Sequence, residues 1–476
     1  MSINDESNSS TQTENQQVNH SEQTIKKPPK SWKQRLAWLG PGLTWMAAGA
    51  GGAGELLFPP RVGSLYGYTL LWAAVAAVFL KWFINHEIGR LAVCTGATIL
   101  DAFKQVPGPR NWAVWLIVLP QLVVSVTAIA GLAASAATAL ILVLPGNTSL
   151  WMAVILLSTM VFLLWGKYSK LELVAKILAI ALAITAVVTA VTVFPSFDTL
   201  VAGLAPQIPQ NVNYQEVVPW LSFVLAGAAG MTWYSYWVVE KGYGVGKVSD
   251  RPGEMLHPED LSSQEKKYLR GWITEMTIDI TIGVLGGLFI VIAFLILGAE
   301  LLRPEGIVPA EDRVAEVLGQ LLGNVWGQIG FWFMIVAVFF GFLQTTLTNQ
   351  DGWGRLLADG TNIILRSFGV GGRWSNEEFL RKVYIVVLLT IAPSVVYIVV
   401  GEPVAILQLA GIIEAIHIPL ITWVTLYLNK TLLPRQLQPS KFMFWATVLA
   451  GLFYAGFATI YLLQVLGVVA SSSGSA

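Results

Sequence analysis

Eleven apolar segments, each long enough to cross a membrane as a helix, run through most of this chain of 476 residues. A helix needs about 20 apolar residues to span the hydrocarbon core of a bilayer. Apolar residues make up 55% of the chain and charged residues 12%, which excludes an ordinary soluble domain. The pattern predicts an all-α polytopic membrane protein. The segments lie near 36–58, 66–93, 112–143, 149–166, 171–194, 216–240, 272–298, 325–350, 382–400, 404–428 and 441–468.

Basic residues collect on alternate connections between these segments. The 241–271 loop carries six of them, whereas the opposite set of loops holds only Arg61, Arg303 and Arg313. Lysine and arginine are enriched in cytoplasmic loops. The asymmetry predicts a cytoplasmic N-terminus and, after eleven spans, an outside C-terminus. The chain shows no transit peptide, which favours a bacterial inner membrane.

The domain organisation follows from the odd number of spans. We expect a disordered polar tail at 1–35, one transmembrane domain at 36–470 and a flexible end at 471–476. Eleven spans fit two inverted repeats of five, near 36–194 and 216–428, plus an extra helix at 441–468. The single cysteine, Cys94, excludes a disulfide within the chain. The oligomeric state stays open.

Two glycine-rich interruptions fall at corresponding positions of these repeats. The first is AAGAGGAGE at 47–55 and the second is AGAAGMTWYSYW at 226–237. Each glycine costs about 1 kcal/mol relative to alanine in a helix interior. Small residues also allow close helix packing, but paired interruptions mark the substrate site of many secondary transporters. The pattern therefore predicts broken helices 1 and 6 around a central site.

The candidates for substrate contact near these interruptions are Gly52, Gly54, Glu55, Ala228, Met231 and Trp233. Glu55 ends the first glycine run, and it either contacts the substrate or lies at the outer interface. Met231 is either a core filler or a soft thioether ligand for a metal. Trp233 begins an aromatic cluster that either packs or walls a pocket around a cation. Glu55 and Met231 are the predicted metal ligands.

Four further ionisable residues are candidates for coupling or proton relay, namely Lys81, Asp279, Glu414 and His417. Lys81 lies near the middle of the second span, where an isolated lysine is costly, so it needs a partner such as Glu55, Glu275 or Asp279. A lysine there can also replace a coupling cation. Glu414 and His417 share one helix face in span 10, as either a relay or a structural pair.

Motifs of soluble enzymes are absent from the sequence. There is no P-loop, dinucleotide fingerprint or paired-cysteine zinc pattern. We therefore expect a protein that is not an enzyme, needs no cofactor and binds no nucleic acid. Its expected partners are the lipid bilayer and a transported ion or small solute.

Several stretches resemble the Nramp family of divalent-metal transporters. They are GPG at 40–42, GSLYGYTLLW at 63–72, GRLAVCTG at 89–96 and GFLQTTLTNQDGWGRLLADG at 341–360. The resemblance covers about residues 36–430. It implies a LeuT-like fold of two inverted five-helix repeats, with helices 1 and 6 broken around the substrate.

The binding motifs of that family are altered in this sequence. The Asp-Pro-Gly-Asn motif of helix 1 aligns with Gly52, Ala53, Gly54 and Glu55, so the acidic ligand falls on Gly52. The Met-Pro-His motif of helix 6 aligns with Met231 to Trp233. The acids of helix 3 are replaced by Gln121, Ser125 and Thr127. The resemblance leaves the carbonyls of Gly52 and Ala228 as possible additional ligands.

The sequence leads to three functional hypotheses. The first is a secondary transporter that moves a metal ion, a divalent cation held at an altered Nramp-like site, by alternating access. The alternative keeps the fold and carries a small organic solute such as an amine or amino acid. The third is a membrane receptor or scaffold that does not transport.

Overall fold

The computed structural model describes residues 25–50, 52–166, 169–209, 212–246, 255–466 and 468. Most of the predicted N-terminal tail and the predicted flexible end at 471–476 lie outside these residues. Within the predicted tail, residues 32–35 are helical, because α1 (Trp32–Trp38) begins there behind a capping box at Ser31.

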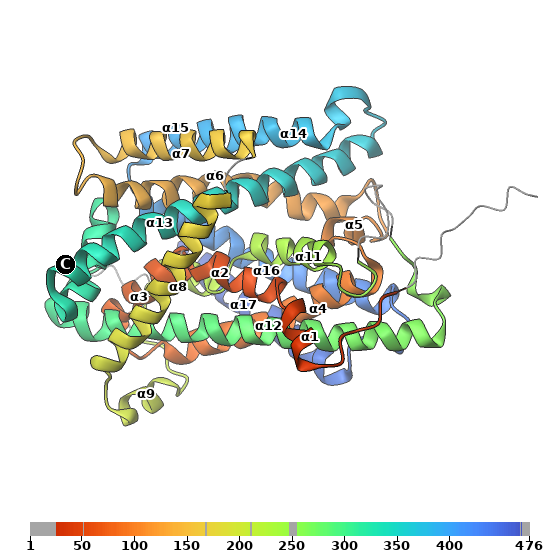
Figure 1. The fold of residues 1–476 in the computed structure, drawn as a ribbon, viewed down its shortest axis with the longest axis horizontal. Helices are drawn as coiled ribbons and strands as arrows, with labels where there is room; N and C mark the ends of the chain where they lie inside the picture. The colour runs from red at the N-terminus through yellow and green to blue at the C-terminus, as the bar shows by residue number, and fades with distance from the viewer. Residues whose placement is uncertain are drawn as a thin grey trace, which may run out of the picture.

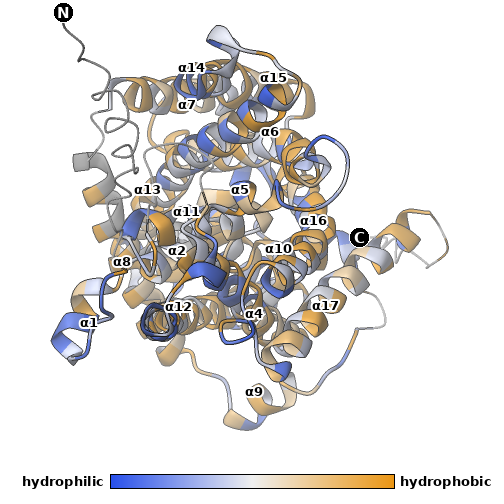
Figure 2. Ribbon diagram, turned by 90° about the vertical axis from the view of Figure 1, so that its right-hand side faces the viewer, coloured by the Kyte–Doolittle hydropathy of each residue, from blue (hydrophilic) through white to orange (hydrophobic). Residues whose placement is uncertain are grey.

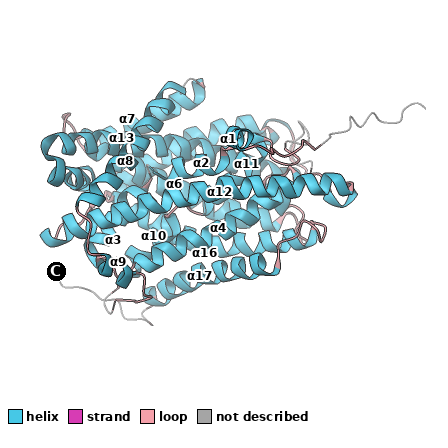
Figure 3. Cartoon of the chain, turned by 60° about the horizontal axis from the view of Figure 1, so that its bottom comes forward, coloured by secondary structure: helices cyan, strands magenta, loops and turns pink. Residues whose placement is uncertain are grey.

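The described part of the chain contains helices and loops and no strand (Figure 3). Its first half contains α2 (Pro41–Ala50), η1 (Ala53–Leu57), α3 (Phe58–Tyr66), α4 (Leu71–Thr95), α5 (Ile99–Phe103), α6 (Trp112–Leu140), α7 (Thr148–Trp165), α8 (Ser169–Thr192) and α9 (Phe197–Gly203). Its second half contains α10 (Tyr214–Phe223), α11 (Ala228–Lys241), α12 (Ser263–Leu297), α13 (Val314–Ser367), α14 (Glu377–Val383), η7 (Tyr384–Ile391), α15 (Ala392–Val400), α16 (Pro403–Thr431) and α17 (Lys441–Val465), with short helical turns between them.

Nine helical stretches of the described residues are long and apolar enough to cross a membrane, or ten if the bent pair α8–α9 counts as one span. The first predicted span is not among them, because its break divides it into α2 and α3. Each of the eleven predicted segments therefore corresponds to helical structure. The all-helical fold class is confirmed.

The helices run roughly parallel to the long axis of the molecule (Figure 1). The helices α1 and α5 lie toward one end, and α3 and α9 lie toward the other. The interior helix α16 packs against α6, α10 and α17, while α12 packs against α2 and α4. Viewed along the helices, hydrophobic residues cover most of the bundle, and hydrophilic ones gather on α1 and end loops (Figure 2).

The structure differs from the sequence prediction at the C-terminal end of span 8. The predicted 351–382 loop is helical as far as Ser367, because α13 continues well past residue 350. Trp353, Leu356, Leu357 and Ile363 keep one face of this extension buried. The apolar face therefore extends the helix beyond the predicted span. Closer to its N-terminal end, α13 is kinked at Gly327, whose φ is 65°.

Candidate substrate site

The first break is narrower than the sequence predicted. The helix α2 continues to Ala50, and Gly52 is extended, with φ −92° and ψ 176°. Residues 53–57 form the π-helical turn η1, so Glu55 lies within a helical turn. Pro59 and Pro60 occupy the first turn of α3, where proline costs no backbone hydrogen bond. The backbone is therefore interrupted close to Gly52, and Glu55 follows immediately.

The second break lies earlier than the predicted 226–237. The helix α10 ends at Phe223, and α11 begins at Ala228. Between them, Leu225 and Ala226 have positive φ values of 57° and 80°. Met231 and Trp233 are therefore helical, which corrects their predicted place in the interruption. Ala226 and Gly227 still belong to the break, whereas the alanine and glycine residues at 228–230 form the start of α11.

The two breaks lie in direct contact. A Cβ atom on Gly54 would lie 2.3 Å from the carbonyl oxygen of Phe223, so only glycine permits this approach. The Leu225 N–H donates a hydrogen bond of 2.7 Å to Oε1 of Glu55. Glu55 is 2% exposed, and the carboxylate thus ties the turn that follows the break in helix 1 to the break in helix 6.

A second carboxylate reaches the break in helix 6 from α16. The Ala228 N–H donates to Oε2 of Glu414 over 2.5 Å, and the Ala229 N–H donates to Oε1 over 3.4 Å. These are the first amides of α11, where a helix leaves N–H groups without intrahelical acceptors and favours negative charge. Gly227 makes room, since a Cβ there would lie 2.8 Å from Cδ of Glu414.

Gln121 of α6 joins Glu414 to its predicted partner His417. Its Nε2 lies 3.3 Å from Oε1 of Glu414 and 3.0 Å from Nδ1 of His417. Its Oε1 accepts a hydrogen bond of 2.6 Å from Trp353 Nε1. An amide that donates to Nδ1 places the proton of a neutral His417 on Nε2. The predicted pair is therefore bridged by an amide, and its relay role stays a prediction.

Lys81 lies on the other side of the same break. Its Nζ donates to the carbonyl oxygens of Ser222, Val224 and Ala226 over 2.5, 2.5 and 2.9 Å. Glu55 and Glu414 are the carboxylates near enough to act on its charge. Of the predicted partners, Glu55 is thus confirmed as a neighbour. Glu275 instead pairs with Arg35 at 3.2 Å.

Asp279 has a capping role in the structure. It accepts hydrogen bonds from Gly40 N–H over 2.9 Å and Gly42 N–H over 2.6 Å, at the start of α2. The carboxylate satisfies amides that the helix leaves free and complements its dipole. Asp279 does not line the central cavity described below, so this position favours a structural role over the predicted coupling role.

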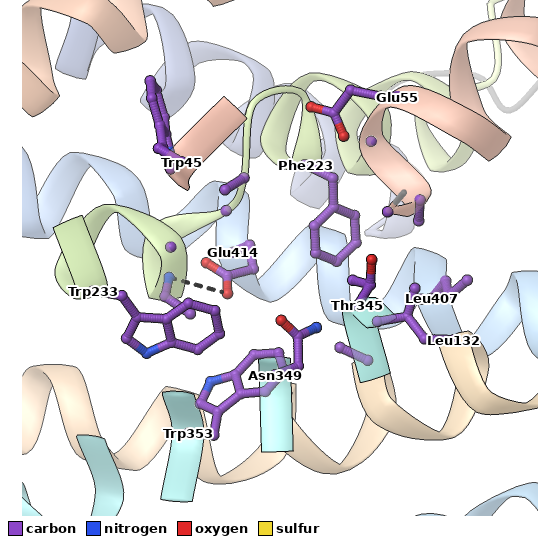
Figure 4. A pocket seen from close by; sticks show the side chains of 18 of the residues that line it. Trp45, Glu55, Leu132, Phe223, Trp233, Thr345, Asn349, Trp353, Leu407 and Glu414 are labelled. Atoms are coloured by element: carbon purple, nitrogen blue, oxygen red, sulfur yellow. Dashed lines mark hydrogen bonds between the residues drawn. The ribbon is translucent and has the colours of Figure 1, made fainter. Parts of the chain in front are cut away.

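A cavity of about 70 Å³ lies between the two breaks (Figure 4). Of the predicted site residues, Gly52, Gly54, Glu55, Trp233 and Glu414 line it. Ala228, Met231, Lys81 and His417 do not. Trp237, from the aromatic cluster that begins at Trp233, also lines the cavity, as do Thr345 and Asn349. The lining residues that the sequence reasoning did not single out include Trp45, Phe223 and Trp353.

The donor set of the cavity consists of oxygen groups and aromatic rings. Carboxylates come from Glu55 and Glu414, a hydroxyl from Thr345 and an amide from Asn349. Met231 is fully buried outside the lining, so its sulfur is not among these groups. Within the described residues, no three His, Cys, Asp or Glu side chains form a group that could hold a metal on their own.

Comparison with known proteins gives a consistent picture. The family model described as natural resistance-associated macrophage protein-like, Nramp, matches residues 44–464. An uncharacterized protein of Pasteurella multocida is 24% identical over 455 residues, which cover 92% of this chain and 94% of that protein. A divalent metal cation transporter of Yersinia enterocolitica is 30% identical over 91 residues, or 19% of this chain and 22% of that protein.

Solved structures resemble the fold over nearly its whole length. A manganese transporter of Eremococcus coleocola, in a mutant form, superposes with a TM-score of 0.68 at 13% identity. The match covers 94% of this chain and 92% of that one. The same transporter in complex with an aromatic bis-isothiourea substituted compound gives a TM-score of 0.65 at 14% identity. At this identity the likeness shows the fold alone.

Proposed function

Because this chain belongs to the Nramp family, we propose that it is a secondary transporter that moves a divalent metal ion through the cavity between its two helix breaks. The ion keeps part of its water shell and crosses by alternating access. One observation carries the proposal: Glu55 and Glu414 line one cavity from different helices, at the break in helix 6. Two carboxylates on one buried cavity favour a cation.

The chemistry of the lining supports a hard ion. Its polar side chains offer carboxylate, hydroxyl and amide oxygens, and no histidine or cysteine of the described residues lines it. Such ligands suit Mg²⁺ and Mn²⁺ better than Zn²⁺ or Cu⁺. A cavity of about 70 Å³ has room for water beside an ion. Retained water supplies the ligands that the protein lacks, as Mg²⁺ sites commonly require.

A small organic cation is a second candidate, favoured by the aromatic walls of the cavity. Trp45, Phe223, Trp233, Trp237 and Trp353 all line it. Aromatic faces bind alkylammonium groups through their negative quadrupole. In Figure 4 the Trp233 and Trp353 rings lie together beside Glu414, and they meet edge to face with centroids 5.2 Å apart.

Uptake into proteoliposomes tests both candidates. We expect accumulation of Mn²⁺ or Mg²⁺ and no accumulation of methylammonium, choline or putrescine. Glu55→Gln and Glu414→Gln each lower metal uptake at least about tenfold, because even changes outside the ligand shell commonly cost that much. Met231→Ala leaves uptake near the unmodified level, since Met231 does not line the cavity.

Glu305→Gln is the matched control, because Glu305 is exposed in the short turn at 303–305 and does not line the cavity. Metal uptake that survives both substitutions at Glu55 and Glu414 contradicts the proposed site. Amine uptake without metal flux contradicts the proposed cargo and supports the second candidate. Absence of any flux from this panel favours the receptor or scaffold hypothesis.

A further inference from the structure

We propose that Lys81 is a resident cation: its ammonium group occupies a backbone carbonyl site in helix 6 that would otherwise take a free monovalent cation. The chain then needs no sodium or potassium ion at this place. That metal transport proceeds without such an ion rests on the proposed function. That the Lys81 ammonium group fills the carbonyl site does not.

The ammonium group is fully matched by its acceptors. An ammonium ion has three N–H donors, and Nζ of Lys81 meets three carbonyl oxygens, those of Ser222, Val224 and Ala226. All three contacts lie between 2.5 and 2.9 Å. Backbone carbonyls converging on one point at such distances form the kind of site that also coordinates alkali cations.

The carbonyls converge because of the backbone of the break. Val224 leaves the helix with ψ 123°, and the next two residues have positive φ. Every second carbonyl from 222 to 226 is thereby directed at Nζ. The carbonyls of Ser222 and Val224 also lie at the C-terminal end of α10, where the helix dipole favours a positive charge.

The site is closed to water and lipid. Lys81 is 0% exposed, and the ring of Tyr454 on α17 lies 5.6 Å from its Nζ. Tyr454 is itself 1% exposed, and its hydroxyl donates to the carbonyl of Ala77, one turn before Lys81. A charge enclosed in this way has no access to solvent, so it stays on the carbonyls as a fixed part of the protein.

Lys81 also positions the substrate carboxylates through the same backbone segment. The carbonyls of residues 222, 224 and 226 bind Nζ, while the N–H groups of Leu225 and Ala228 bind Glu55 and Glu414. One short segment thus presents acceptors to the cation and donors to the anions. Lys81 is therefore a positioning residue, because it acts on the cavity through this segment.

The first test uses the unmodified protein. Metal uptake is measured in proteoliposomes with Na⁺, K⁺ or N-methylglucamine as the sole monovalent cation, at equal ionic strength. A resident cation predicts rates that agree within about twofold, since no monovalent ion contributes binding free energy at this site. A rate that falls several-fold when Na⁺ and K⁺ are both absent overturns the proposal.

The second test needs no cargo. Thermal unfolding of purified Lys81→Met is followed with Na⁺, K⁺ or methylammonium added, and N-methylglucamine chloride as the ionic-strength control. Emptying the carbonyl site predicts a rise in melting temperature with at least one small cation, because a ligand that binds the folded state stabilises it. The unmodified protein and Lys441→Met, which removes an exposed lysine, show no such rise.

The two measurements separate the possible failures. A melting temperature of Lys81→Met that no small cation raises overturns the resident-cation proposal, whether or not the protein transports metal. If Lys81→Met does not fold, the cation dependence of the unmodified protein decides. If the proposed function alone is wrong, no metal flux occurs in any salt. Small cations still raise the melting temperature of Lys81→Met in that case.

Discussion

Single glycines determine where the two carboxylates of the cavity lie. Gly54 lets the first break approach the carbonyl of Phe223, and Gly227 leaves room for Glu414 beside the start of α11. Neither requirement concerns flexibility, because both arise from the space that a Cβ atom would occupy. A methyl group at either place has to move a backbone or a buried carboxylate.

Gly227→Ala is expected to weaken the site. The added Cβ would lie 2.8 Å from Cδ of Glu414, so the carboxylate shifts away from the amides of Ala228 and Ala229. We expect a loss of about 1–3 kcal/mol in stability, typical of an overpacked core, and a large loss of transport. Thermal unfolding and uptake measure the two effects.

Gly456→Ala on α17 is the control for that substitution. A Cβ there meets no atom of the described residues within 4 Å, so the change leaves the packing intact. Alanine in a helix interior is favoured over glycine by about 1 kcal/mol, which predicts equal or slightly higher stability. Equal behaviour of the two variants would contradict the role assigned to Gly227.

The sequence predicted the charged residues of the cavity better than the aromatic residues and backbone groups around them. Glu55 and Glu414 stand out because acids are rare and costly in apolar spans, and both line the cavity. Trp45, Phe223 and Trp353 carry no such signal, since aromatic residues occur throughout apolar helices. The carbonyl partners of Lys81 could not be predicted, because they depend on positive φ at Leu225 and Ala226.

The broken helices form the site through their ends. The helix α10 directs carbonyls at Lys81, and α11 directs amides at Glu414. Both breaks were predicted from small residues, but the second was placed too late. Alanine and glycine at 228–230 lie within α11, while the break begins at Val224 and Leu225, which are ordinary apolar residues.

The helices α3 and α10 are joined by a partly buried ion pair. Arg61 donates to both carboxylate oxygens of Glu216 over 2.7 Å, and Nε2 of Gln408 on α16 donates to Glu216 over 2.8 Å. Arg61 also bonds the carbonyl of Pro309. This cluster therefore holds three helices together at one end of the bundle.

Arg61→Ala is expected to destabilise the protein by about 1.5–3 kcal/mol, because it removes charge-assisted hydrogen bonds to the partly buried Glu216 carboxylate. Arg313→Ala removes the exposed pair with Glu316 and should cost much less stability, because solvent screens this pair. Chemical denaturation of the two variants in the same detergent compares them. Similar losses would show that burial of the Arg61 pair contributes nothing.

The whole molecule has the fold of a manganese transporter at very low sequence identity. Membrane helices of this kind are specified by length, hydropathy and small packing residues, which many sequences supply. The all-helical membrane class and the family were therefore predictable from the sequence. The cargo was not, because it depends on a few side chains that meet only in the folded bundle.

The loop charges predict that the N-terminus is cytoplasmic and the C-terminus is outside. A C-terminal alkaline phosphatase fusion in a bacterial inner membrane should be active, and a C-terminal green fluorescent protein fusion should be dark. An N-terminal fluorescent fusion should be bright and serves as the control. A bright C-terminal fusion would mean an even number of spans or the opposite orientation.

Anomalous X-ray diffraction from crystals grown with Mn²⁺ tests whether the cavity between the two helix breaks binds the metal ion. We expect one strong manganese peak inside the cavity. The ion should lie about 2–2.6 Å from an oxygen of Glu55 or Glu414, or contact that oxygen through one water. The same experiment on Glu414→Gln should give a weaker peak. A cavity that holds no manganese at a Mn²⁺ concentration that saturates uptake would contradict the proposed metal site.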